Sequence, residues 1–281
     1  MSLSLVTNVQ SLRVQSNLTA ATATMNQAIE RMTTGYKINC AKDDAAGYSI
    51  ASQMEAKLSS YDVASNNAQI GLDMLTTTEE NYTLITEHLQ RIRDLAEQAA
   101  NGTYSEDSRE AIEAEIASRL AEIDRVAGSA EYNGMNLMDG SLANDVNIQV
   151  GIDGTANSRV TLVSTLFGKA DAKTLLGEEN ADFAASCAST EAYDSLSTID
   201  KAIDNISNRV TTLGASQNRL ESALDAISVS TENLTSSLST VKDADVANES
   251  TKYIQAQILQ SAAATLLSTA NQTPSIALQL I

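Results

Sequence analysis

The sequence predicts a mainly α-helical protein, in which a long antiparallel helical coiled-coil rod carries paired terminal helices and a small β-hairpin. Among its 281 residues there are one proline and 12 glycines, so few positions interrupt a helix. Hydrophobic residues make up 43% of the chain but aromatic residues only 4%, and such small apolar side chains suit narrow seams between helices. In two long segments apolar residues recur every seven positions, as in coiled coils.

The first predicted helix lies between Leu3 and Lys37, with Gly35 marking its end. Apolar residues spaced by three and four positions form one stripe on this otherwise polar segment. The stripe contains Leu5, Val9, Leu12, Met25, Ile29 and Met32. We therefore predict an amphipathic helix within residues 1–42.

Two further helices are predicted before residue 130. The first covers about residues 45–100, because a seven-residue apolar row runs through it and Asn101-Gly102 ends it. The row contains Met54, Tyr61, Ala68, Leu75, Tyr82, Leu89 and Ala96. Ser105, which is followed by two acidic residues, is a good N-cap for a shorter helix over 105–128.

A β-hairpin is predicted over about residues 146–163. Apolar and polar residues alternate from Val146 to Ile152, Asp153-Gly154 forms a turn, and the alternation resumes at Val160. Tyr132-Asn133-Gly134 is predicted to be a turn as well. Residues 167–194 show only a weak pattern, so we expect a loop there that includes a helical turn.

The strongest periodicity covers residues 195–241, where two apolar rows are both mostly filled. One row contains Ile199, Ile206, Leu213, Leu220, Ile227, Leu234 and Val241. Such a helix needs a partner along its whole length, and the helix over 45–100 is the obvious one. With the helix over 105–128 as third member, these elements form the rod domain, residues 43–240.

The last segment, residues 241–281, is predicted to be a terminal helix that pairs with the first. Val246 to Leu267 has a helical pattern rich in alanine. Pro274 is expected to break this helix before the apolar end of the chain, because proline has no amide hydrogen to donate. The chain would then run out and back, with both termini at one end.

The charge distribution separates the ends from the middle. The net charge is −18, which argues against a nucleic-acid or membrane partner, since phosphates and lipid headgroups attract basic proteins. Residues 1–40 and 241–281 are nearly neutral, so the middle carries almost all of the negative charge. This pattern predicts that the ends are buried against other copies of the chain.

Catalytic and metal-binding motifs are missing from the sequence. His88 is the only histidine, so a His-Glu-x-x-His zinc site is excluded, and no nucleophile elbow or phosphate-binding glycine loop is present. Cys40 and Cys187 lack metal-ligand spacing and are expected to be two thiols. We therefore predict a protein that is not an enzyme and has no cofactor. The N-terminus has no signal-peptide pattern, so any export would use another route.

Several motifs together resemble bacterial flagellin in its short form, with little or no outer variable domain. They are residues 29–39, residues 41–47, Leu89 to Ala96, Arg119 to Val126, residues 132–134, residues 256–260 and residues 270–272. The resemblance implies a structural subunit that polymerises into the flagellar filament for motility. The terminal helices of such a subunit form the inner tube of the filament, and the rod surrounds that tube. Cys40 stands where the family commonly has serine.

The same resemblance implies the partners and the location. They are other copies of the chain, the flagellar type III export apparatus and its chaperone, and the filament cap and hook-junction proteins. The protein would be secreted and extracellular, in the bacterial flagellum. A hook-filament junction protein shares the terminal helices and is the alternative.

The resemblance also implies that the monomer is recognised by the host Toll-like receptor for flagellin, through Gln90, Arg91, Leu95 and Glu115. An alternative interpretation is that Leu95 packs inside the rod and Arg91 pairs with a neighbouring acid, so that these residues serve assembly alone.

Assembly is expected to use the apolar residues of the two ends. These are Leu5, Val9, Leu12, Met25, Ile29, Met32, Ile254, Ile258, Leu266 and Leu280. A single helix pair cannot bury such stripes, so it does not recover the ordering entropy of about 1–2 kcal/mol per residue. We predict that the ends are disordered in the monomer and ordered in the polymer.

Overall fold

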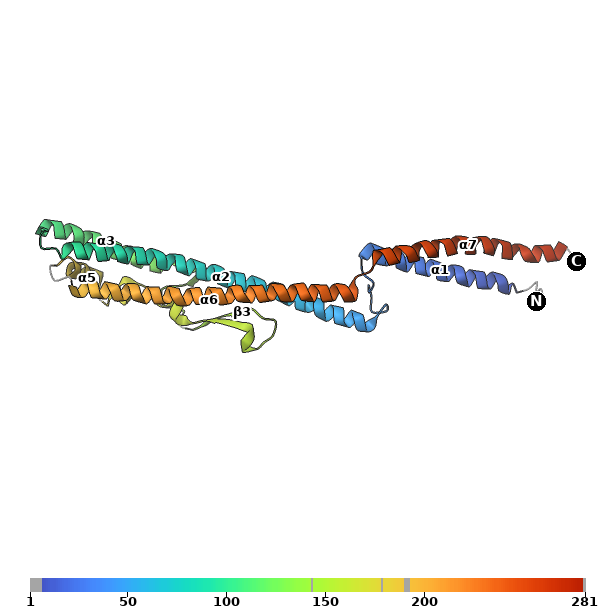
Figure 1. Ribbon diagram of the computed structural model, residues 1–281, viewed down its shortest axis with the longest axis horizontal. Coiled ribbons are helices and arrows are strands. Elements are labelled where there is room, and N and C mark those ends of the chain that lie inside the picture. Colours follow the sequence, from blue (N-terminus) through green and yellow to red (C-terminus); the bar gives the residue numbers. More distant parts are fainter. Residues whose placement is uncertain (1–6, 143, 178, 190–192, 280–281) are drawn as a thin grey trace. The chain divides into compact units, whose positions relative to one another are not determined.

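The computed structural model describes residues 7–142, 144–177, 179–189 and 193–279, and this part of the chain is mainly helical (Figure 1). It divides into two compact units, one formed by residues 1–58 with 232–281 and the other by residues 59–231. The long helices α2 (Ala45–Ala99) and α6 (Tyr193–Lys242) contribute residues to both units. The predicted fold class is confirmed.

In the first unit, α1 (Val9–Thr34) and α7 (Val246–Gln279) lie side by side and antiparallel (Figure 1). Two hydrogen bonds show the direction, because Asn8 contacts Ala270 and Thr22 contacts Gln260. The start of α1 thus lies beside the last turns of α7, as predicted. Gly35 ends α1 with a φ of 76°, a left-handed conformation that favours glycine.

The segments that follow α1 and precede α7 are hydrogen-bonded to each other. Tyr36 and Asp243 form an isolated antiparallel β-bridge. The Lys37 amide donates to the Lys242 carbonyl, and the Ala244 amide donates to the Gly35 carbonyl. The base of the α1/α7 pair is therefore held by backbone bonds as well as by side chains.

In the second unit, α2 packs against α6 and against α3 (Glu106–Ser129). Arg93 bonds to Asp200 at 2.7 Å and Gln217 bonds to Glu79 at 2.9 Å, so α2 and α6 are antiparallel. Ser105 caps α3, as the sequence predicts. The structure confirms the seven-residue row of each long helix within the second unit, since four consecutive members are completely buried: Leu75, Tyr82, Leu89 and Ala96 on α2, and Ile199, Ile206, Leu213 and Leu220 on α6.

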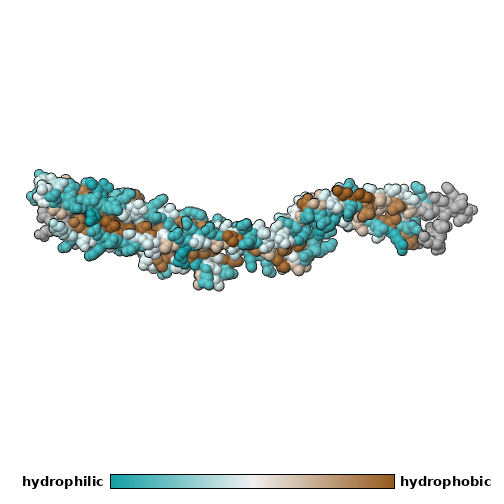
Figure 2. Space-filling view, viewed as in Figure 1, coloured by the Kyte–Doolittle hydropathy of each residue, from teal (hydrophilic) through white to brown (hydrophobic). Residues whose placement is uncertain are grey.

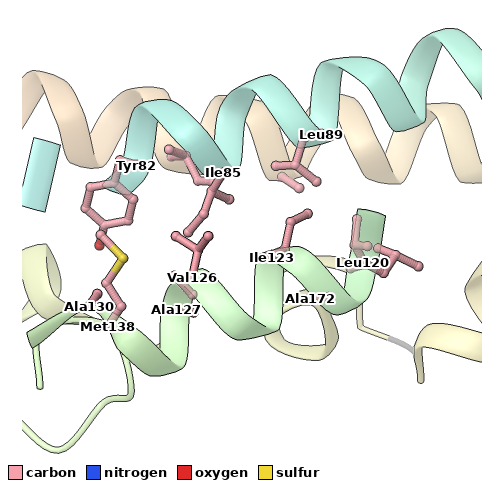
Figure 3. Close-up of a cluster of buried hydrophobic side chains, with 14 of the residues drawn as sticks. Tyr82, Ile85, Leu89, Leu120, Ile123, Val126, Ala127, Ala130, Met138 and Ala172 are labelled. Carbon is pink, nitrogen blue, oxygen red and sulfur yellow. The ribbon is translucent and has the colours of Figure 1, made fainter. Parts of the chain in front are cut away.

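The core continues between α2 and α3 (Figure 3). Figure 3 shows the buried side chains of one helix meeting those of the other, with Leu89 opposite Ile123 and Tyr82 near Met138. Burial in this core raises the pKa of the Tyr82 hydroxyl, which donates to the Leu166 carbonyl at 2.7 Å. Tyr82 thus ties the 3-10 helix η2 (Ser164–Phe167) to the core.

Two antiparallel strand pairs are present in the described residues. Strands β3 (Val146–Gln149) and β4 (Arg159–Leu162) form the predicted hairpin, with Val146 opposite Leu162. These strands are shorter than the alternation suggested, since the amides of Val150 and Gly151 both donate to the Ser158 carbonyl, next to a 3-10 helix η1 (Ala156–Ser158). The predicted turn around Asn133 joins the small strands β1 (Glu131–Tyr132) and β2 (Met135–Asn136).

Residues 167–194 contain more helix than the predicted loop with a helical turn. This region contains the short helices α4 (Ala172–Leu176) and α5 (Asn180–Cys187). Both are anchored by one carboxylate of α3, because Asp124 accepts from the Ala172 amide and from the Asn180 side chain. Helices of this length are marginal by themselves, so tertiary contacts rather than local periodicity stabilise them.

The prediction that Pro274 breaks the terminal helix was wrong, since α7 continues to Gln279. Proline leaves the carbonyl four residues earlier, that of Ala270, without its helical donor. The side-chain amide of Asn8 donates to that carbonyl at 2.8 Å instead. A neighbouring helix thus satisfies the group that the proline leaves free.

Candidate functional site

The seam between α1 and α7 is built from alanine. Ala21 and Ala28 on α1, and Ala256 and Ala263 on α7, are all buried, and in each helix the two are seven residues apart. Small side chains let two helices approach closely and leave little room for larger ones between them. The larger apolar side chains of this pair are either half-buried, as Met25 and Met32 are, or exposed.

The exposed larger side chains form an apolar surface on α1 and α7, and Figure 2 shows apolar patches on this helix pair. Exposure reaches 56% for Leu12 and 63% for Ile258, so half or more of each side chain meets solvent. Soluble proteins rarely leave that much apolar surface uncovered on one element. The exposed set, called the terminal apolar surface below, consists of Val9, Leu12, Ile29, Val246, Ile254, Ile258, Leu259 and Leu266.

Most of the predicted assembly residues belong to the terminal apolar surface. Six of the ten are members, Met25 and Met32 are half-buried, and Leu5 and Leu280 lie outside the described residues. The prediction missed Leu259, although its seven-residue spacing from Leu266 was a signal that could have found it. A groove of about 450 Å³ beside the alanine seam is lined by Leu259, Leu266, several alanines and polar side chains such as Lys252.

At the base of the pair, a buried carboxylate joins the two helices. Glu249 is 6% exposed, and its Oε1 lies 3.4 Å from Arg31 and 2.7 Å from Lys252. A carboxylate this deeply buried requires such cationic partners. The Arg31–Glu249 ion pair therefore links α1 and α7, while Lys252 on α7 itself also compensates the Glu249 charge.

The motif over residues 39–47 folds the turn that leads into α2. The Asp43 carboxylate accepts from the amides of Asn39 and Cys40, and these bonds lower the pKa of Asp43. Asp44 caps α2 by accepting from the amide of Gly47, where an added Cβ would lie 2.6 Å from Asp44 Oδ2. The motif thus has a structural role, and Cys40 is an exposed thiol beside Asp43.

The four residues predicted for receptor contact are not all on the surface. Arg91 on α2 pairs with Glu115 on α3 at 3.0 Å, and Gln90 is exposed beside them. Leu95 is only 2% exposed and belongs to the core of the second unit. The structure therefore brings Arg91 and Glu115 together and places Leu95 behind them.

Among the described residues, no three His, Cys, Asp or Glu side chains gather as a metal-binding group. Within the described ranges, no helix combines the length and the apolar content that a membrane span requires. His88 is half-buried beside Arg119, with 3.5 Å between Nδ1 and the guanidinium.

Comparison with known proteins gives the same family for both ends of the chain. Residues 5–143 match the bacterial flagellin N-terminal helical region, and residues 196–281 match the bacterial flagellin C-terminal helical region. The chain is 34% identical to a flagellin of Listeria innocua and 32% identical to a flagellin of Bacillus subtilis, and each alignment covers 98% of both chains.

A solved structure shows a related fold at lower identity. It is that of a putative flagellar hook-associated protein from Vibrio parahaemolyticus, which is 17% identical with a TM-score of 0.60. That alignment covers 72% of this chain and 100% of the other, and it supports the fold alone. Because the two family regions cover most of the sequence, and the flagellin relatives match it over nearly their whole length, the chain belongs to the bacterial flagellin family, in a short form without a large variable domain.

Proposed function

We propose that this flagellin, a structural subunit of the flagellar filament, polymerises through the terminal apolar surface of α1 and α7. One observation carries the proposal: the helix pair buries alanines in its own seam and leaves the terminal apolar surface exposed. Burying one Ile or Leu side chain contributes about 1.5–3 kcal/mol. Neighbouring copies would cover this surface.

Within the filament, residues 1–42 and 241–281 would form the inner tube and residues 43–240 the surrounding layer. The nearly neutral ends and the acidic middle support this assignment, because a crowded inner layer tolerates few unpaired charges. Family membership supports three further parts of the proposal. The chain would be exported by the flagellar type III apparatus with a chaperone, and it would be secreted and extracellular. It would also contact the cap and hook-junction proteins.

The alternative is a hook-filament junction protein. The likeness to the Vibrio hook-associated protein is one of fold, whereas the flagellin relatives share about a third of their residues with this chain. A junction protein would act in few copies and would not form long filaments. The assembly experiment distinguishes the two functions.

The first prediction concerns assembly of the unmodified protein. Addition of a precipitating salt is expected to produce long filaments, visible by electron microscopy, together with a rise in helicity measured by circular dichroism. The rise is expected because the 26 residues of α1 and the 34 residues of α7 would become ordered only when neighbours cover them. Equal helicity in monomer and polymer would contradict the predicted ordering, and the absence of filaments would contradict the proposed function.

We also propose that the monomer binds the host Toll-like receptor for flagellin through an exposed patch formed by Gln90, Arg91 and Glu115. The supporting observation is that Glu115 of α3 holds the guanidinium of Arg91 of α2, while Gln90, the residue before Arg91, is exposed. Exposed Arg residues are frequent anchors of protein interfaces. Leu95 would contribute indirectly, by packing α2 against the core behind the patch.

The second prediction tests this patch with a charge reversal. Arg91→Asp is expected to weaken binding of the monomer to the purified receptor ectodomain more than tenfold, because it removes the anchor and repels Glu115. Arg93→Asp is the matched control, since Arg93 lies on the same helix and pairs with Asp200 of α6. Binding can be measured by surface plasmon resonance, with circular dichroism to confirm the fold. Similar affinities for the two variants would overturn the proposed patch.

A further inference from the structure

The terminal helices contain one backbone carbonyl with an unusual partner. In an α-helix each carbonyl accepts from the amide four residues later. At position 274 that amide is missing, because proline carries no amide hydrogen, and this is the only proline in the sequence. The carbonyl of Ala270 therefore needs a donor from outside α7.

Asn8 supplies that donor while it also caps α1. Its Nδ2 donates to the Ala270 carbonyl at 2.8 Å, and its Oδ1 accepts from the Ser11 amide at 3.1 Å. Both ends of one side-chain amide are thus used, one on each helix. Ser11 adds a second bond across the pair, since its hydroxyl donates to Asn271 Oδ1 at 2.8 Å.

The alanine seam does not by itself select one alignment of α1 on α7. Ala21 and Ala28 are seven residues apart, as are Ala256 and Ala263, so a slip by one heptad would again place small side chains opposite each other. Such a slip would move α1 along α7 by roughly 10 Å, at about 1.5 Å per residue. The terminal apolar surface would then present a different pattern to neighbouring copies.

We propose that Asn8 and Pro274 form a register lock, in which the single proline marks one carbonyl of α7 and Asn8 on α1 recognises it. In a slipped pair the Ala270 carbonyl would lose its donor, and Asn8 would face carbonyls that already accept from the amides of their own helix. Asn8 is therefore a positioning residue. The ion pair of Glu249 with Arg31 holds the other end of the pair. This inference rests on the proposed polymerisation, because the register decides which apolar side chains meet in the filament.

The test is a double-mutant cycle on the full-length chain. Asn8→Asp keeps an oxygen for the cap and removes the donor, and Asn8→Ser keeps a capping hydroxyl that is too short to span to α7. Each is expected to raise the critical concentration for salt-induced polymerisation about fivefold, the loss of one hydrogen bond. Pro274→Ala restores the missing amide hydrogen. In that background the same two changes at Asn8 are expected to alter the critical concentration less than twofold.

The outcomes separate the lock from the proposed function. If the unmodified chain polymerises and the effect of the Asn8 changes is the same with and without Pro274→Ala, the lock is wrong and the polymerisation proposal stands. If the unmodified chain forms no filaments, the proposed function fails. The lock rests on that function and fails with it.

Discussion

Replacement of Ile258 by glutamate is expected to abolish polymerisation while leaving residues 59–231 folded. Ile258 is 63% exposed on α7, so the isolated chain tolerates the change, whereas a neighbour that covers this position would have to bury an unpaired carboxylate. The lost burial and the added desolvation together predict a rise of at least about a hundredfold in the critical concentration. Pelleting after salt addition and electron microscopy measure this directly.

The matched control is Ile258→Leu, which keeps an apolar side chain of the same volume at the same place. It is expected to polymerise within about twofold of the unmodified chain, since volume-conserving apolar exchanges are well tolerated. Thermal unfolding followed by circular dichroism checks that both variants retain the second unit. Normal filaments from the glutamate variant would show that this face of α7 is not covered in the polymer.

Truncation of Leu89 to alanine is expected to destabilise the second unit by about 3 kcal/mol. Leu89 is completely buried between α2 and α3, where it faces Ile123 (Figure 3). Removing a buried Leu side chain forfeits its transfer free energy and leaves a cavity that the neighbours fill only partly, at a typical cost of about 2–5 kcal/mol. In a unit of this size the midpoint of thermal unfolding should fall by roughly 6–12 °C.

Leu84→Ala provides the comparison on the same helix, because Leu84 is 45% exposed and leaves no cavity when it is truncated. Its effect is expected to stay within about 0.5 kcal/mol. Urea and thermal unfolding of the monomer measure both variants. Equal losses of stability for the two truncations would mean that the seven-residue row through Leu89 does not form the core.

Local patterns in the sequence were sufficient to predict the helices and one hairpin. The seven-residue rows of α2 and α6 contain the buried residues, since a row with that spacing stays on one side of a helix. Gly35 and Ser105 marked helix ends correctly, because a left-handed cap and a side-chain cap are local interactions. The flagellin motifs likewise identified the family that both terminal regions match.

Local patterns failed where a distant group decides the structure. The short helices α4 and α5 depend on contacts with Asp124 of α3, so no pattern within residues 167–194 predicted them. Pro274 was predicted to end a helix that continues, since the donor that compensates for it is Asn8, at the other end of the chain. Leu95 was assigned to a receptor contact by family resemblance, but it is buried in the core.

The sequence by itself determined the helical fold, the paired ends and the family, because helix caps and seven-residue spacing act within a few turns of one chain segment. Only the tertiary structure decided which face of the terminal helices is inside. Alanines on α1 and α7 pack together, since two helix backbones approach most closely where side chains are small, and the larger apolar side chains are thereby left on the surface. Periodicity shows that a stripe exists, but the choice between its small and large members depends on how two distant helices fit together.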